Sequence, residues 1–142
     1  MNPLKNTLFK IPNFDVSSIS IQGKGAKKLV VICRKQGFSE VQLTALQKMI
    51  SAIKYDYEND IFMLTCDENE QISLSMLNVE YKDLILFGIK PENIGYNLDY
   101  KSQEINKLDK SRLLVFEGLD VVLADNNKKL LLWNKLQEMF LK

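Results

Sequence analysis

The sequence contains no histidine among its 142 residues. Histidine is the side chain most often used for proton transfer near neutral pH and is the commonest metal ligand, so its absence excludes most sites of both kinds. The only two cysteines, Cys33 and Cys66, each lie in an apolar run, where a thiol usually packs as a small hydrophobic group. We therefore expect no disulfide, no zinc site and no bound cofactor.

Long apolar runs and a strong net charge are also lacking. No segment approaches the roughly 18 apolar residues that span a bilayer, and the N-terminus has no apolar core followed by a cleavage site. These features predict a protein of the reducing cytoplasm with no membrane partner. The 19 basic and 18 acidic residues leave a net charge of +1, so we expect any contact with nucleic acid to be local, and indirect or weak.

Hydrophobic residues make up 46% of the chain and charged residues 26%, which is typical of a folded domain. Residues 28–142 are expected to form a single α/β domain. Residues 1–27 differ, because proline, asparagine and serine interrupt their apolar residues, and we interpret them as an N-terminal arm with a candidate edge strand at 17–22. Five residues of the arm either anchor a protein partner or cover an edge of the chain's own sheet: Leu4, Leu8, Phe9, Ile11 and Phe14.

Apolar runs bounded by turn residues predict four buried strands in the domain. They are residues 29–33, 60–66, 83–88 and 113–116. Ser39 and Gln42 form a capping-box pattern ahead of a helix that extends to about Lys54. Its apolar stripe comprises Val41, Leu43, Leu46, Met49, Ile50 and Ile53. Asp125 is expected to cap a final helix that contains Leu132, Trp133, Leu136, Met139 and Phe140.

This order of strands and helices is typical of a parallel sheet with helical crossovers. The predicted fold is therefore α/β with three layers, a mainly parallel four-stranded sheet carrying helices on both of its faces. Ligands of such sheets bind beyond the carboxyl ends of the strands, so a functional site is sought in the loops at that edge.

Acidic residues follow two of the predicted strands. Asp67, Glu68 and Glu70 could bind a hard cation, but their spacing lacks the glycine and the closing glutamate of a calcium loop, so a solvated turn is favoured. Glu117 and Asp120 could act as an acid/base pair, yet no histidine or cation lies near them in the sequence to support that role. We therefore predict no catalytic residue and no metal ligand.

Basic residues form three small clusters. Lys24, Lys27 and Lys28 lie in the segment GKGAKK and are candidate nucleic-acid contacts. This segment precedes a strand, whereas a phosphate-binding glycine loop follows one, so a plain turn is expected. The remaining clusters are Lys107, Lys110 and Arg112, and Lys128 with Lys129. Aromatic residues are not interleaved with these cations as a stacking platform requires, which favours a solvated surface.

Two stretches resemble the uracil-DNA glycosylase fold and, within it, the psi subunits of the bacterial DNA polymerase III clamp loader. The stretch DLILFGIKPENIG, residues 83–95, resembles the third core strand with its terminal glycine. The stretch RLLVFEGLDVVLADNNKKLLLWNKLQEMF, residues 112–140, resembles the fourth strand, its loop and a closing helix. That helix carries the pattern Lys-x-x-Leu-Trp-x-x-Leu from Lys129 to Leu136, with Trp133 within it. The resemblance spans residues 28–141.

The resemblance implies a fold that has lost its glycosylase chemistry. An active glycosylase of this type ends its first strand in a water-activating Gly-Gln-Asp-Pro-like segment and its fourth in a His-Pro-Ser-like loop that grips DNA. Residues 34–37 and 117–120 stand at these places here, and they lack that acid and that histidine. In the psi family the N-terminal arm docks onto the clamp-loader collar, while the body binds the chi subunit, which links the loader to single-stranded-DNA-binding protein.

From these observations we predict a non-enzymatic protein-protein interaction subunit in DNA replication, whose partners are clamp-loader or chi-like proteins. Two alternatives stay open. One is a divergent enzyme of the same fold that acts on nucleic acid or a nucleotide, using Glu117, Asp120 or Asp67. The other is a self-associating domain.

Overall fold

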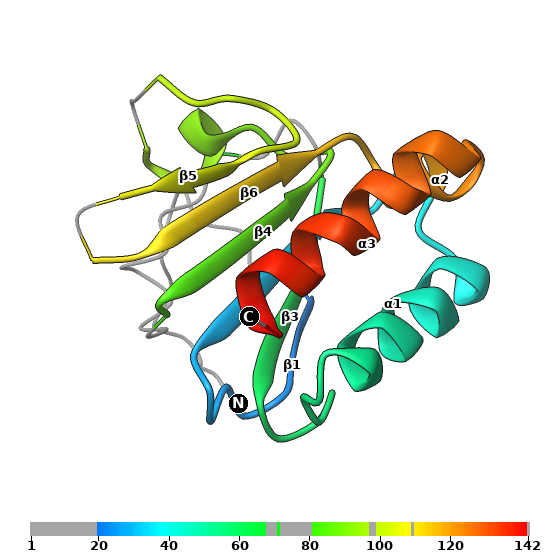
Figure 1. The fold of residues 1–142 in the computed structure, drawn as a ribbon, viewed down its shortest axis with the longest axis horizontal. Coiled ribbons are helices and arrows are strands. Elements are labelled where there is room, and N and C mark those ends of the chain that lie inside the picture. Colours follow the sequence, from blue (N-terminus) through cyan, green and yellow to red (C-terminus); the bar gives the residue numbers. More distant parts are fainter. Residues whose placement is uncertain (1–19, 68–70, 72–80, 97–98, 109, 142) are drawn as a thin grey trace, which may run out of the picture.

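The computed structural model describes residues 20–67, 71, 81–96, 99–108 and 110–141, which form one sheet and its helices (Figure 1). The strands are β1 (Ser20–Gln22), β2 (Leu29–Arg34), β3 (Ile61–Cys66), β4 (Asp83–Phe87), β5 (Ile105–Lys107) and β6 (Arg112–Phe116). The α-helices are α1 (Glu40–Ala52), α2 (Leu119–Leu123) and α3 (Asn126–Phe140), and a 3-10 helix, η3, spans Pro91–Ile94.

The sheet has six strands in the order β1-β3-β2-β4-β6-β5. The four predicted strands form its parallel centre, β3-β2-β4-β6, and the two edge strands run antiparallel to their neighbours. β1 lies within the segment predicted to supply an edge strand. The predicted count of four strands is wrong, because β5 was not foreseen. Its residues, Ile-Asn-Lys, carry no apolar run, and the strand forms by pairing with β6.

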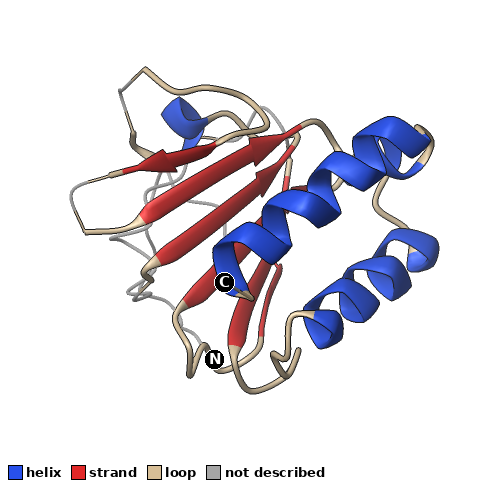
Figure 2. Ribbon diagram, viewed as in Figure 1, coloured by secondary structure: helices blue, strands red, loops and turns tan. Residues whose placement is uncertain are grey.

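Both faces of the parallel centre are buried, which explains its nearly continuous apolar sequence. On one face, Val31, Phe87 and Leu114 belong to a core shared with α1, α2 and α3. Figure 2 shows these three helices on the same side of the sheet. On the other face Ile32 and neighbouring side chains form a second core with Ile94 of η3. The described α-helices therefore lie on one face, whereas helices on both faces were expected.

Helix α1 begins as predicted, because the backbone N–H of Ser39 donates a 2.9 Å hydrogen bond to the side chain of Gln42 in a capping box. Leu46, Ile50 and Ile53 are buried, but Val41 is 69% exposed and does not belong to the apolar stripe. At 3.6 residues per turn, Val41 points about 140° around the helix from Leu46. Val41 was expected in the stripe on its apolar character alone.

Helix α3 is also capped as predicted. The carboxylate of Asp125 accepts hydrogen bonds from the backbone N–H groups of Asn127 at 2.9 Å and Lys128 at 3.3 Å. Leu132, Leu136 and Met139 are buried against the sheet. None of the helices in the described part of the chain is both long and apolar enough to cross a membrane.

Candidate functional site

The direction of chain travel across the sheet reverses between β2 and β4. From β2 the chain crosses to β3 on one side, whereas from β4 it crosses to β6 on the other. Open α/β sheets bind ligands at such a reversal, in a crevice beyond the carboxyl ends of the strands. β2 ends there with Arg34, β4 leads into Gly88, and β6 leads into Glu117 and Gly118.

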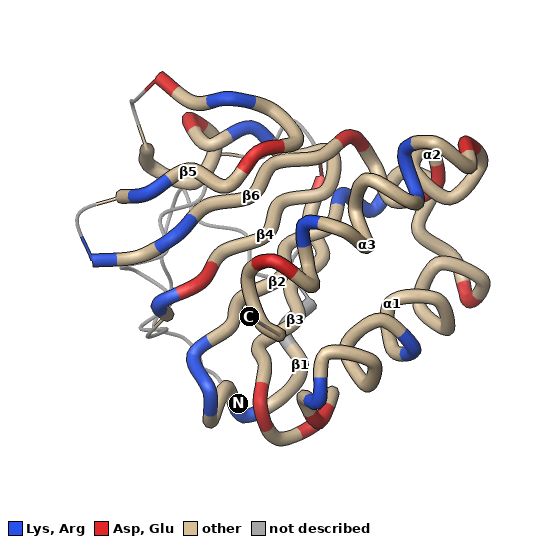
Figure 3. The backbone as a smooth tube through the Cα atoms, in the orientation of Figure 1, with Lys and Arg blue, Asp and Glu red and all other residues tan. Residues whose placement is uncertain are grey.

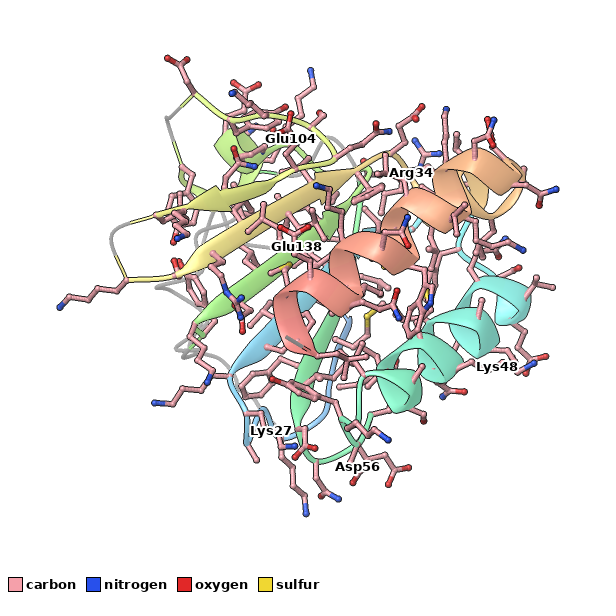
Figure 4. The ribbon with its side chains drawn as sticks, in the orientation of Figure 1. Lys27, Arg34, Lys48, Asp56, Glu104 and Glu138 are labelled. Carbon is pink, nitrogen blue, oxygen red and sulfur yellow. The ribbon has the colours of Figure 1, made fainter. Side chains whose placement is uncertain are left out.

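The side chain of Arg34 occupies this crevice. It lies across Gly88 and Gly118, so a Cβ added at Gly88 would come within 2.6 Å of Arg34 Cδ, and one added at Gly118 would overlap the guanidinium. Gly88 also has a φ of +76°, which glycine adopts at low cost. Figure 4 places Arg34 beyond one end of the sheet, beside the start of α2. Two glycines therefore make room for one arginine.

Arg34 is held in place by a residue of the loop after β2 and a residue of α2. Its Nη2 lies 2.9 Å from Oδ1 of Asp120, in the first turn of α2, and its Nε donates to the carbonyl of Gln36 at 3.0 Å. The Arg34 side chain is 21% exposed. The Asp120 carboxylate in turn packs against Gly37, where a Cβ would overlap it. This ion pair joins the end of β2 to the helix that follows β6.

The loop after β3 is tied to the same cluster. The amide Nε2 of Gln36 donates to Oδ2 of Asp67 at 3.2 Å. Asp67 was predicted to be the first residue of a solvated acidic turn, and the other two members, Glu68 and Glu70, lie outside the described residues. Within the part of the chain that the structure describes, no three His, Cys, Asp or Glu side chains come together as a metal site would require.

Glu117 and Asp120, which could have formed an acid/base pair, are each engaged with a different cation. Glu117 lies 2.6 Å from Nζ of Lys128 in α3, whereas Asp120 pairs with Arg34. The hydrogen bond to Glu117 raises the pKa of Lys128, because it stabilises the charged ammonium. The cations that pair with Asp120 and Glu117 come from other elements, Arg34 from the end of β2 and Lys128 from α3. We name Arg34, Gln36, Asp67 and Asp120 the edge cluster.

No family model matches this sequence, and neither the curated proteins nor the solved structures gave a match. The function is therefore inferred from the residues and their geometry.

The candidate nucleic-acid contacts Lys24, Lys27 and Lys28 lie at the opposite end of the sheet from the edge cluster, as the labels for Lys27 and Arg34 show (Figure 4). Their segment is the plain turn that was expected. The backbone N–H groups of Lys24 and Lys27 donate to the carbonyls of Glu58 and Asp60, each at 3.0 Å. These amides are already used within the protein and do not cradle a phosphate. The Lys27 ammonium lies 3.7 Å from Asp60 and over the ring of Tyr55.

The candidate partner-binding residues Leu4, Leu8, Phe9, Ile11 and Phe14 lie outside the described residues. Their role in docking, or in covering an edge of the sheet, stays a prediction.

A small hollow of about 150 Å³ lies at the β1 edge of the sheet, where α1 covers it. It is lined by Gln22, Lys35, Phe38, Leu43, Tyr57, Met63 and Thr65. Burial raises the pKa of Tyr57 to about 12, so its phenol is neutral at physiological pH. With one cation and no carboxylate, this lining offers no acid/base pair.

The two cysteines are free and buried, as predicted. Cys33 belongs to the core on the α-helical face, and Cys66 belongs to the core on the other face, so their side chains point to opposite sides of the sheet. Burial, with the nearby Cys66 as a smaller contribution, raises the pKa of the Cys33 thiol. A buried thiol of raised pKa is a poor nucleophile.

We expect both thiols to resist a thiol-specific disulfide reagent in the native protein. Their reaction should be at least about a thousandfold slower than in urea, because exposure requires unfolding. The reaction can be followed by the absorbance of the released thiolate. A variant with an exposed cysteine, Ser102→Cys, provides the control and should react rapidly at that one site. Rapid reaction of the unmodified protein would contradict the burial.

No pattern in the sequence indicated Arg34 as the centre of this site. Arg34 and Asp120 are 86 positions apart, and no local pattern connects them. One signal was available. Gly88 is the last residue of one predicted strand and Gly118 follows another, and a glycine in a strand often marks the close approach of another group.

Proposed function

We propose that this protein is a non-enzymatic docking subunit, with a fold like that of uracil-DNA glycosylase and a role like that of the psi subunit in bacterial DNA replication. The observation that carries the proposal is the position of Arg34. It fills the crevice in which an enzyme of this architecture would bind its substrate. The carboxylates Asp120 and Glu117 are both paired with cations, which favours a structural role for them.

The fold part of the proposal is supported by how the two glycosylase-like segments lie. The resemblance placed residues 34–37 and 117–120 at a shared reaction site, and the Arg34–Asp120 ion pair joins one segment to the other. The parallel order β3-β2-β4-β6 also agrees with a doubly wound sheet. At that shared site Arg34 and Asp120 form an ion pair with each other. An active glycosylase would hold a water molecule and DNA there.

The docking part of the proposal concerns the N-terminal arm, which would bind the clamp-loader collar in the cytoplasm while the folded body binds a chi-like protein. Aliphatic and aromatic residues on an arm gain affinity by burial in a partner, each contributing about 1.5–3 kcal/mol when fully covered. The arm residues that we expect to act as anchors are Leu8, Phe9, Ile11 and Phe14.

We expect the full chain to co-elute with clamp-loader subunits encoded in the same genome. A variant should lose at least about a hundredfold in affinity for them when four arm residues are changed to serine: Leu8, Phe9, Ile11 and Phe14. Calorimetry with the purified collar measures this loss. The matched control changes Val41 and Leu130 to serine, since these side chains are 69% and 58% exposed on the folded body. The control should bind normally.

Four outcomes would overturn parts of this proposal. Unchanged binding after deletion of residues 1–16 would reject the arm as the docking element, and no binding at all would reject the docking role. Turnover of uracil-containing or abasic DNA that Glu117→Gln abolishes would establish the enzymatic alternative. A stable dimer in light scattering, without binding to any clamp-loader subunit, would favour self-association.

A further inference from the structure

The end of the sheet where β2, β4 and β6 begin, which we name the amino edge, is rich in cations. Lys82 precedes β4, Lys107 ends β5, and Lys110 and Arg112 lie at the start of β6. These four residues, which we name the basic rim, line one solvent-open hollow of about 400 Å³ together with Asp83, Leu108 and Ser111. Figure 3 shows the cations of this edge in a row at the amino ends of the strands.

Most of the charge on the basic rim is not neutralised by the described residues. Arg112 is paired with buried Asp83, but Lys82, Lys107 and Lys110 form no ion pair with any residue that the structure describes. Two acidic residues that adjoin the rim in the sequence, Glu80 and Asp109, lie outside the described residues. Even with both of these carboxylates counted beside Asp83, the four cations of the rim leave a surplus of positive charge.

The register of the sheet also sets two of these cations against each other. Lys107 lies directly opposite Arg112 in the β5–β6 pair. Like charges in that position destabilise an antiparallel pair. Because Asp83 already balances Arg112, the charge that remains at this pair is that of Lys107, and an anion bound at the rim would neutralise it.

Aromatic side chains adjoin the basic rim at Lys110, on the face of the sheet opposite the α-helices. A neighbouring hollow of about 270 Å³ is lined by Tyr81 and Tyr96 together with Leu108, Lys110 and Ser111, so the two hollows share three residues. Tyr81 immediately precedes Lys82, and both tyrosines are half-buried. Interleaved aromatic residues were not expected, because Tyr96 reaches this place only through the fold and Tyr81 precedes Lys82, which belongs to none of the three predicted basic clusters.

We propose that the amino edge binds single-stranded nucleic acid, with phosphates at Lys82, Lys107 and Lys110 and a base against Tyr81 or Tyr96. Proteins that bind single strands combine a basic groove with aromatic surfaces on which bases stack. An acidic peptide would interact with the lysines but has no base that could stack on the tyrosines. The bases of a duplex are already stacked on one another, so they are not free to stack on the tyrosines either. With about three phosphate contacts, binding should be weak and strongly dependent on salt. This inference is independent of the proposed docking function.

The first test measures fluorescence anisotropy of a labelled oligothymidylate of about 15 nucleotides with the full chain, between about 50 and 200 mM salt. In the rim variant, Lys82, Lys107 and Lys110 are changed to glutamine. It should bind at least tenfold more weakly at the lowest salt, and the slope of log K against log salt should fall by about 2 in magnitude. Arg112 is left intact because it neutralises Asp83.

A matched control removes the same charge elsewhere. Lys48, Lys90 and Lys129 are exposed, and none of them lines the basic rim. Changing these three to glutamine should leave the slope within about 0.5 of the parent value. An equal loss in both triple variants would show that net charge alone drives binding and would overturn the proposal, as would an absence of binding by the parent protein at low salt. Circular dichroism verifies that each variant is folded.

The aromatic half of the site needs its own test. Tyr81→Leu and Tyr96→Leu keep apolar bulk but remove the ring, so the variant at the stacking position should lose about fivefold or more in affinity without any change in salt slope. A duplex of the same length should bind more weakly than the single strand. If poly-glutamate competes as well as oligothymidylate and neither tyrosine variant loses affinity, the surface recognises acidic protein and the proposal is wrong.

Discussion

Replacing Arg112 with methionine should lower the free energy of unfolding by about 3 kcal/mol. Asp83 is only 1% exposed, and Arg112 Nε lies 2.7 Å from its Oδ1. The other oxygen, Oδ2, is buried without a hydrogen-bond partner among the described residues. Methionine retains much of the side-chain length of arginine but leaves the carboxylate without its counter-charge. Urea denaturation monitored by circular dichroism measures the loss.

Arg112 also stabilises the end of α3. Its Nη1 donates to the carbonyl of Met139 at 3.0 Å, and its guanidinium lies 5.6 Å from the centre of the Phe140 ring. A cation at a helix C-terminus interacts favourably with the last carbonyls. The substitution should therefore loosen the last turn of α3 as well, which hydrogen exchange at residues 136–141 would detect.

Two comparisons separate the buried charge from the loss of packing. In the double variant Asp83→Val with Arg112→Met, both charges are gone, so stability should return to within about 1 kcal/mol of the parent. Lys135→Met, which removes the half-buried ion-pair partner of the exposed Glu138, should cost less than about 0.5 kcal/mol. A cost for Arg112→Met no larger than that of Lys135→Met would contradict the role assigned to the buried pair.

Replacing Gly118 with alanine should destabilise the protein by about 1–2 kcal/mol, through Arg34. Gly118 has a φ of −51°, which alanine adopts freely, so the added methyl introduces no backbone strain. Its Cβ would overlap the guanidinium of Arg34 and would displace it from Asp120. The expected cost is the loss of one ion pair and the hydrogen bond to Gln36.

A double-mutant cycle tests this explanation. If Arg34 causes the cost, Gly118→Ala should be nearly neutral in an Arg34→Ala background, giving a coupling energy of at least about 1 kcal/mol. Gly88→Ala is the matched comparison. Arg34→Ala should rescue it only partly, because its φ of +76° stays unfavourable for alanine. Additive effects of Arg34→Ala and Gly118→Ala would show that Arg34 does not fill the crevice as described.

Features that depend on neighbouring residues in the sequence were predicted well. The four strands of the parallel centre were found from apolar runs, and the caps at Ser39 and Asp125 from their side chains and spacing. The burial of Cys33 and Cys66 followed from the same runs. Val41 was misplaced because apolar character was counted without its angle around the helix.

Other features could not be predicted because they join distant segments. β5 is a strand only because β6 offers an unpaired edge. Asp120 pairs with Arg34, which is 86 positions away, and Glu117 pairs with Lys128, which is 11 positions away. The same is true of the basic rim, since Lys82 meets Lys107 and Lys110 only where β4 and β6 become neighbours. A local pattern contains no information about strand order.

The sequence by itself determined that this is an α/β protein with a buried parallel centre, no histidine chemistry and two thiols inside the core. These properties follow from composition and from apolar periodicity, which act along the chain. Only the tertiary structure decided that an arginine fills the crevice at the carboxyl ends and that lysines and tyrosines gather at the amino ends. Both arrangements depend on which strands lie side by side, and that is set by packing across the whole sheet.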